Sequence, residues 1–307
     1  MLDVRRLRLL RELARLGTLA AVADAFSYTP SAVSQQLSAL EREAGVPLLR
    51  KAGRRVALTP AGADLAARTE PVLALLEEAA AALAAGRAEM AGVLRIGAFP
   101  TAMRTLLPAA LVTLGAAHPR LELQVTELDP AQVPDALRTG ALDIALVHEY
   151  DYVPAEPDPA LQAEPLLAET IYLASAVAAA LDIEPGDGID PVRQCAARPW
   201  IAASPGTLCH LMTVRLCQGA DFSPRIRHHA DDFTTVLALV AAGQGVALVP
   251  QLALADRPDG VALTALTARR HTLIACRRGS AAHPAVAACS AAIRAATHAY
   301  LARQAAG

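Results

Sequence analysis

The sequence predicts a small helical head, a long linker helix and a larger α/β region, in that order along the chain. Helical spacing of apolar residues dominates the first 59 residues, and an alanine-rich segment with heptad-like spacing follows at 60–90. From 91 to 307, short β-like runs alternate with helical segments. The 307 residues are 54% hydrophobic, which is enough for a core in each of two or three domains.

The head begins with two helical patterns separated by a glycine. Leucines recur at helical spacing from Leu7 to Leu16, and Gly17 ends this pattern. Thr18 can then cap a short second helix that ends at Phe26. Because a third helix starts after a tight connection, these segments predict a helix-turn-helix.

The head is organised around the third helix, which begins near Pro30. Val33, Leu37 and Leu40 form its apolar stripe, and the opposite face is small and polar. Hydroxyl and amide groups on that face can bond to base edges and phosphates, so we predict that it contacts DNA. Exposed helices that bind nothing also carry Ser and Gln, so this helix alone does not decide the function. The candidate residues are Thr29, which can cap the helix, and Ser31, Ser34, Gln35 and Ser38.

A basic segment follows the third helix. Arg50, Lys51, Arg54 and Arg55 flank a turn, and a β-hairpin wing there would carry these cations to phosphates or to a minor groove. A solvated charged loop is the alternative. Residues 1–62 hold ten Arg and Lys against five Asp and Glu, whereas the remainder holds 18 against 25. This asymmetry is expected when one end of a protein meets a polyanion.

Composition and motifs argue against several other classes of protein. No apolar run reaches the roughly 18 residues of a membrane span, and no secretory signal is present, so we expect a cytoplasmic protein with no membrane partner. The five cysteines form no CxxC pair, so we expect neither a disulfide framework nor a metal site. Neither GxSxG nor HExxH occurs, and no glycine-rich nucleotide fingerprint is complete. We therefore expect no enzyme, no catalytic residue and no cofactor.

The head motifs resemble those of a known family, the LysR-type transcriptional regulators. The matching stretches are 17–19, 31–37, 45–49 and 58–62, which follow the family pattern in order and spacing. Thr18, Leu49 and Lys51 stand where the family usually has Ser, Phe and Arg, and Lys51 lacks the bidentate geometry of arginine. The resemblance implies a sequence-specific regulator that binds double-stranded DNA and a small-molecule effector of unknown identity. It also implies a homodimer or homotetramer.

The resemblance further implies two α/β subdomains like those of periplasmic binding proteins. We expect a winged helix-turn-helix at 1–59, a linker helix at 60–90, subdomain I at about 91–166 and 267–307, and subdomain II at about 167–266. By resemblance the linker should pair with its counterpart in a second subunit, although a core helix of a monomer is the alternative. Pro71 predicts a kink or break near residues 67–71 because proline removes a helix hydrogen bond.

Helix N-termini that follow strands predict the effector site, because their free N–H groups bind anions or carbonyls. By resemblance, three such segments, which start near Thr101, Glu127 and Ser204, should line one pocket. With a histidine at a strand end, the candidate residues are Thr101, Leu128, Asp129, His148, Ser204, Gly206 and Thr207. The hydroxyl residues are equally suited to be plain helix caps, and a lone histidine is usually structural. Asp231 fits a helix cap better than a ligand contact.

Two alternative functions remain, a thiol-based redox-sensing regulator and a soluble solute-binding receptor. Cys209 and Cys217 lie in the region where the peroxide-sensing branch of the family carries its reactive pair. On one helix, eight residues separate them by about 12 Å of rise, beyond the roughly 7 Å that a disulfide allows. The basic head and the missing secretory signal oppose the receptor.

Overall fold

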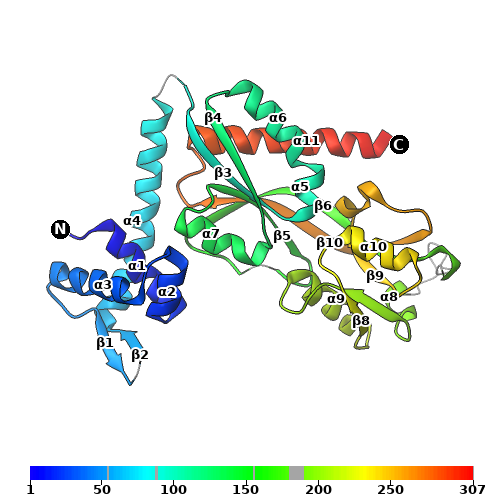
Figure 1. The fold of residues 1–307 in the computed structure, drawn as a ribbon, viewed down its shortest axis with the longest axis horizontal. Helices are drawn as coiled ribbons and strands as arrows, with labels where there is room; N and C mark the ends of the chain where they lie inside the picture. The colour runs from blue at the N-terminus through cyan, green and yellow to red at the C-terminus, as the bar shows by residue number, and fades with distance from the viewer. Residues whose placement is uncertain (54, 87–88, 155, 180–189, 307) are drawn as a thin grey trace.

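The structure, a computed structural model, describes residues 1–307 except 54, 87–88, 155, 180–189 and 307 (Figure 1). A helical head at the left of Figure 1 is joined by one long helix to a larger body. The body contains a mixed sheet covered by helices. Within the described residues, no helix combines the length and apolar character needed to cross a membrane.

The head is a winged helix-turn-helix, as expected. Its elements are α1 (Val4–Leu16), α2 (Leu19–Phe26), α3 (Pro30–Ala44), β1 (Leu49–Ala52) and β2 (Arg55–Leu58). Thr18 and Thr29 cap α2 and α3, since their hydroxyl oxygens accept hydrogen bonds from backbone N–H groups in the first turn. Val33, Leu37 and Leu40 of α3 are buried against leucines of α1. The local caps and the apolar stripe therefore position the polar face of α3 outward.

A single carboxylate attaches the β1–β2 hairpin to α3. The Glu41 Oε1 atom accepts hydrogen bonds from the backbone N–H groups of Leu48 and Leu49, each at 2.9 Å. Gly62 packs directly under the same segment, where an added Cβ would overlap the carbonyl oxygen of Leu48. These contacts fix the hairpin relative to the polar face of α3.

The linker helix α4 (Pro60–Ala85) continues through Pro71, so the predicted break does not occur. Proline costs an interior helix about 3 kcal/mol, and packing on both sides of it offsets that cost. Thr69 is buried and donates its hydroxyl to the carbonyl of Leu65 at 2.8 Å, while Leu73 is buried one turn later. Tertiary contacts thus hold one helix where local chemistry favours an interruption.

The body is built on a six-stranded sheet with the order β4-β3-β5-β10-β6-β9. Its strands are β3 (Gly92–Ala98), β4 (Leu121–Glu127), β5 (Ile144–Tyr150), β6 (Leu161–Ala176), β9 (Ala247–Pro250) and β10 (Val261–Arg277). β3 is parallel to β4 and β5, whereas β10 is antiparallel to β5 and β6. β10 is 17 residues long and pairs with both β5 and β6. β6 and β10 therefore run through both halves of the body.

Helices cover both faces of this sheet in subdomain I (Figure 1). The elements are α5 (Pro100–Thr105), α6 (Leu107–Ala117), η1 (Pro130–Gln132), α7 (Val133–Thr139) and α11 (Pro284–Ala306). Ile144 and Leu146 share a core with α6 and α11, whereas the intervening Ala145 packs with α7. This alternation follows from the period of two along a strand.

The second half of the body adds a small parallel sheet and further helices. Its elements are η2 (Val177–Ala179), α8 (Pro191–Gln194), β7 (Pro199–Ala202), α9 (Leu208–Gly219), β8 (Arg225–His229), α10 (Phe233–Ala241) and η3 (Gln251–Asp256). Asp232 caps α10 by accepting a hydrogen bond from the N–H of Thr235 at 3.0 Å. The prediction that Asp231 begins this helix was wrong by one residue, because Asp232 is the cap. The carboxylate of Asp231 is therefore not used to cap α10.

Candidate effector cleft and DNA-binding surface

The polar face of α3 is exposed to solvent. Ser31, Ser34, Gln35 and Ser38 are all exposed, and none of them packs into the core of the head. The Thr29 hydroxyl caps the helix and lies 3.0 Å from the hydroxyl of Ser31. The face is therefore free of bulky side chains, as contact with a groove requires.

The wing exposes Arg50 and Lys51 to solvent. Arg50 pairs across the hairpin with Ala57 and Lys51 pairs with Val56, and both cations are exposed. Arg54 lies outside the described residues. The backbone of Arg55 pairs with Ala52 in the hairpin. The hairpin thus places the exposed cations Arg50 and Lys51 on a segment that is attached to α3 through Glu41.

A cavity of about 500 Å³ lies between the two subdomains. Subdomain I contributes the ends of its parallel strands, and subdomain II contributes the segments that enter α9 and α10. The lining residues are Phe99, Pro100, Thr101, Glu127, Leu128, Asp129, Pro130, Gln132, His148, Pro205, Gly206, Thr207, Cys209, Asp231, Phe233 and Arg270. Six of the seven predicted effector residues are among them. Ser204 is not, but its backbone N–H and hydroxyl donate to the carboxylate of Asp231 at 2.7 and 2.8 Å.

An arginine at the floor of the cavity is buried in the sheet. Arg270 is paired in register with Tyr150 on β5 and with Glu169 on β6, so all three side chains lie on one face. Its Nε donates to Glu169 at 2.6 Å, and its Nη2 donates to the hydroxyl of Thr101 at 3.0 Å. Burial disfavours the charged form of Arg270, but the attraction of Glu169 prevails and raises its pKa. The carboxylate of Glu169 therefore balances the charge of Arg270 inside the protein.

His148 lies beside this pair and is only 4% exposed. Its ring packs edge-on against Phe99 at 4.8 Å and against Tyr150 at 5.2 Å between centroids. Burial, with a smaller contribution from Arg270, lowers the pKa of His148 well below its usual value. The ring is therefore neutral near pH 7, and its buried Nδ1 atom finds no hydrogen-bond partner in the residues that the structure describes.

The thiol of Cys209 faces the same cavity. Its sulfur lies 3.1 Å from the hydroxyl oxygen of Tyr150, and burial raises the pKa of Cys209 above its ordinary value. Cys217 is fully buried in an apolar core, where desolvation raises its pKa to about 12. Both cysteines lie on the continuous helix α9. Neither thiol is activated as a nucleophile in this arrangement.

Carboxylates surround the mouth of the cavity. Glu127 and Asp129 come from the end of β4, and Asp231 comes from the opposite wall. Asp129 caps η1 by accepting a hydrogen bond from the N–H of Ala131 at 2.8 Å. Asp232 lies next to this group but is paired with Arg104 of α5 at 2.8 Å. The pair joins the two subdomains beside the cavity.

The sequence prediction missed Arg270, Glu169, Asp231 and Cys209 as cavity or floor residues. A signal for the first was present, because Arg269-Arg270-His271 interrupts an otherwise apolar strand. The register that places Glu169 beside Arg270 is a long-range property, which spacing along the chain does not reveal. Asp231 was interpreted as a helix cap, a role that Asp232 has instead.

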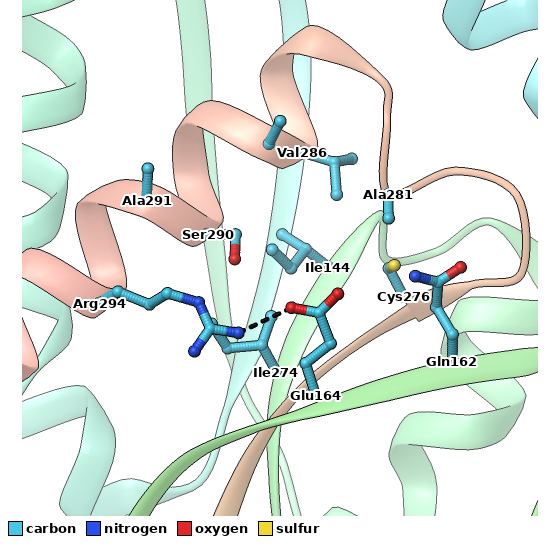
Figure 2. A pocket seen from close by; sticks show the side chains of 11 residues that line it. Ile144, Gln162, Glu164, Ile274, Cys276, Ala281, Val286, Ser290, Ala291 and Arg294 are labelled. Carbon is cyan, nitrogen blue, oxygen red and sulfur yellow. Dashed lines mark hydrogen bonds and ion pairs between the residues drawn. The ribbon is translucent and has the colours of Figure 1, made fainter.

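The body also has cavities other than this cleft. Figure 2 shows a cavity of about 270 Å³ beneath α11, where Arg294 pairs with Glu164 at 2.7 Å. A cavity of about 630 Å³ lies on the α7 side and shares Pro130 and His148 with the cleft. In the described part of the chain, no group of three or more His, Cys, Asp or Glu side chains is arranged to hold a metal ion.

Comparison with known proteins assigns both parts of the chain. Residues 4–63 match the family described as bacterial regulatory helix-turn-helix protein, lysR family, and residues 87–297 match the LysR substrate binding domain. A probable hydrogen peroxide-inducible genes activator of Mycobacterium avium is 30% identical over 237 residues, which cover 75% of this chain and 72% of that protein.

Further relatives agree with this assignment. A similarly described protein of Streptomyces viridosporus is 40% identical over 157 residues, which span 47% of this chain and 49% of that protein. An H2O2-bound cysteine mutant of OxyR from Corynebacterium glutamicum has a TM-score of 0.59 at 26% identity, covering 100% of this chain and 96% of that one. With its winged head, its linker and its two-part body, this chain belongs to the LysR family of bacterial transcriptional regulators.

Proposed function

We propose that this regulator contacts operator DNA with the polar face of α3 and the β1–β2 hairpin, and binds a small-molecule effector in the cleft between its subdomains. The observation that supports the effector site is the 500 Å³ cavity, which is lined from both subdomains and by His148, whose buried Nδ1 has no hydrogen-bond partner among the described residues. A ligand that contacts both walls changes the free-energy difference between their relative positions. Effector binding is thereby coupled to the distance between the DNA-binding heads of the paired subunits.

The proposal extends to the assembly and location of the protein. We divide the chain as expected, with the head at 1–59, the linker at 60–90, and subdomain II at about 167–266 within the body. Val72, Leu76 and Leu83 of the linker are exposed apolar residues that a second subunit would cover. The protein acts as a cytoplasmic homodimer or homotetramer and as a regulator rather than an enzyme.

A thermal-shift screen of metabolites on the full-length protein tests the effector site. A ligand that binds the folded state raises the melting temperature by mass action. The variant His148→Phe retains the ring packing between Phe99 and Tyr150 but removes the polar nitrogen atoms. We expect every stabilising metabolite to lose most of its effect on this variant. An unchanged shift would place the ligand outside the cleft.

Redox sensing is the second candidate, because the relatives include peroxide-inducible activators. The raised pKa values of both thiols and the separation of Cys209 and Cys217 along α9 oppose it. We expect mass spectrometry after peroxide treatment of the native protein to show no disulfide between these cysteines. A Cys209–Cys217 linkage, absent from a Cys209→Ser variant, would establish the redox function instead.

A further inference from the structure

We propose that the effector carries a positively charged nitrogen, most simply an aliphatic amine, which Asp129 and Asp231 bind from opposite walls of the cleft. The proposal rests on the proposed effector function and specifies the chemical class of the ligand. It differs from the expectation that helix N-termini in the cleft bind an anion or a carbonyl group. Charge, hydrogen bonding and the neutral histidine each support it.

The charge of the cavity is the first argument. Its lining carries three carboxylates, those of Glu127, Asp129 and Asp231, against the single guanidinium of Arg270. Glu169 pairs with that guanidinium at 2.6 Å, and both side chains are 1% exposed. An anionic ligand would therefore meet uncompensated negative charge, and each cation of the described lining already has a partner. A cationic ligand would offset that charge.

The two aspartates are oriented by backbone and hydroxyl groups. Asp129 accepts a hydrogen bond from the N–H of Ala131 at 2.8 Å, and Asp231 accepts from the N–H and the hydroxyl of Ser204. These contacts hold each carboxylate in place but leave acceptor capacity, because a carboxylate offers about four lone-pair sites. Each aspartate can thus accept an ammonium hydrogen in addition.

The aspartates also act on a common point in the cleft. Both contribute to the raised pKa of Cys209, which lines the same cavity, although burial is the larger cause. Asp129 belongs to subdomain I and Asp231 to subdomain II. A cation placed between them attracts both walls, so its binding favours the arrangement in which the walls are closest.

His148 supplies a second, independent indication of a ligand. It lines the cavity and is only 4% exposed, and within the described part of the chain its Nδ1 has no hydrogen-bond partner. A buried polar atom without a partner is costly, so a ligand group that bonds to it gains affinity. Since the ring is neutral, it suits an uncharged hydroxyl or amide group. The effector class is therefore an amine that also carries a neutral polar group.

Two competing interpretations are weaker. The N-terminus of α9 favours anions, but it is equivalent to only about half an elementary charge. Thr207 already caps it by accepting from the N–H of His210. A metal ion would need converging carboxylates, and the described residues contain no such group of three ligands. An organic cation fits this spacing of charges better.

The test uses full-length protein and matched probes of two to six carbons: α,ω-diamines, amino alcohols, diols and dicarboxylates, with calcium chloride as a metal control. We expect thermal stabilisation by at least one amine series, strongest for amino alcohols, and none by dicarboxylates. Stabilisation by dicarboxylates or calcium but not by amines would overturn the proposal. So would the failure of every amine.

Variants locate the effect in the cleft. Asp129→Asn retains the oxygen that accepts from Ala131, and Asp231→Asn retains one acceptor oxygen for the N–H of Ser204 together with an NH2 group that can donate to its hydroxyl. Each variant should raise the dissociation constant of the best amine about tenfold or more. Glu122→Gln removes an equal charge from an exposed site on β4 outside the cavity. This control should change the dissociation constant of the same amine less than about twofold. Equal losses in all three variants would indicate non-specific attraction to an acidic surface and would refute the proposal.

The outcomes also separate this inference from the proposed function. If dicarboxylates bind and His148→Phe abolishes their binding, the cleft is an effector site and the amine inference fails alone. If amines bind to both aspartate variants as tightly as to the native protein, they bind elsewhere. If no probe and no screened metabolite shifts the melting temperature, the effector function fails as well.

Discussion

The head and the cleft use polar residues in opposite ways. In the head, the DNA contacts predicted on α3 and those at Arg50 and Lys51 are exposed, and the hydrophobic core consists of other residues, so the groups for binding and the groups for folding are different. In the cleft, Arg270, Glu169 and His148 are at most 4% exposed and belong to the sheet itself. The difference teaches that substitutions can separate binding from stability in the head but not at the floor of the cleft.

Solvation explains this difference. An exposed serine or glutamine is hydrated in the free protein, so its loss has little effect on folding. A buried ion pair depends on each partner, because removing one leaves the other as an uncompensated charge in a medium of low dielectric constant. The two regions should therefore respond differently to substitution.

The largest expected effect is at the floor of the cleft. Arg270→Met leaves the buried carboxylate of Glu169 unpaired, and we expect the free energy of unfolding to fall by about 3–5 kcal/mol. Urea denaturation measures it. The double variant Glu169→Gln with Arg270→Met should recover part of the loss, and the exposed neighbour Arg269→Met serves as control. A loss below about 1 kcal/mol for Arg270→Met would contradict the contrast between the regions.

Substitutions in the linker should strongly weaken the assembly of subunits and have little effect on the folding of each chain. Leu76 and Leu83 are 43% and 76% exposed in one chain, and a paired linker would bury them. Charge in such a seam must be desolvated, so Leu76→Glu and Leu83→Glu should raise the dimer dissociation constant about a hundredfold. Sedimentation measures it. Ala85→Glu, on the opposite side of α4, should leave the dimer intact.

If Leu76→Glu and Leu83→Glu both sediment as the native protein does, then subunits pair through another surface. The head should remain folded in every one of these variants, because neither leucine belongs to its core.

In the head, loss of a base contact and loss of a phosphate contact should be distinguishable. Gln35→Ala should lower operator affinity by about 1–3 kcal/mol with little change in salt dependence. Arg50→Ala should weaken binding to every sequence and reduce the salt slope by about one unit. Unfolding by urea should be unchanged in both, since both side chains are exposed.

Binding titrations on operator and scrambled duplexes at several salt concentrations measure these effects. The assignment fails if Gln35→Ala weakens both duplexes equally while Arg50→Ala leaves the slope unchanged.

The smallest expected effect is a pH dependence that arises from His148. Its pKa in the folded protein is depressed, so between that value and the unfolded value of about 6.5 only the unfolded chain binds the proton. Its contribution to stability is complete above about pH 6.5 and decreases as the pH falls below it. Between pH 6.5 and pH 5.5, the free energy of unfolding should fall by about 1 kcal/mol more for the native protein than for His148→Phe. If the free energies of unfolding of the native protein and His148→Phe fell in parallel with pH, the assignment of His148 as a buried neutral imidazole would be wrong.

The sequence alone determined the elements that depend on neighbours along the chain. The caps Thr18 and Thr29, the stripe of Val33, Leu37 and Leu40, and the exposed polar face of α3 follow from interactions within four residues. Six of the seven predicted effector residues also line one cavity, because the carboxyl ends of parallel strands meet at one edge of a sheet. These predictions needed only local chemistry and strand order.

Only the tertiary structure decided which of these residues have charged partners. Arg270 and Glu169 are 101 residues apart, and the antiparallel register of β10 and β6 brings them together. The same holds for Asp231, which bonds to Ser204 across the loops after β7 and β8. Pro71 continues a helix because buried side chains on both sides of it hold the backbone in place. Long-range packing and desolvation determine such pairs, and neither can be inferred from spacing along the chain.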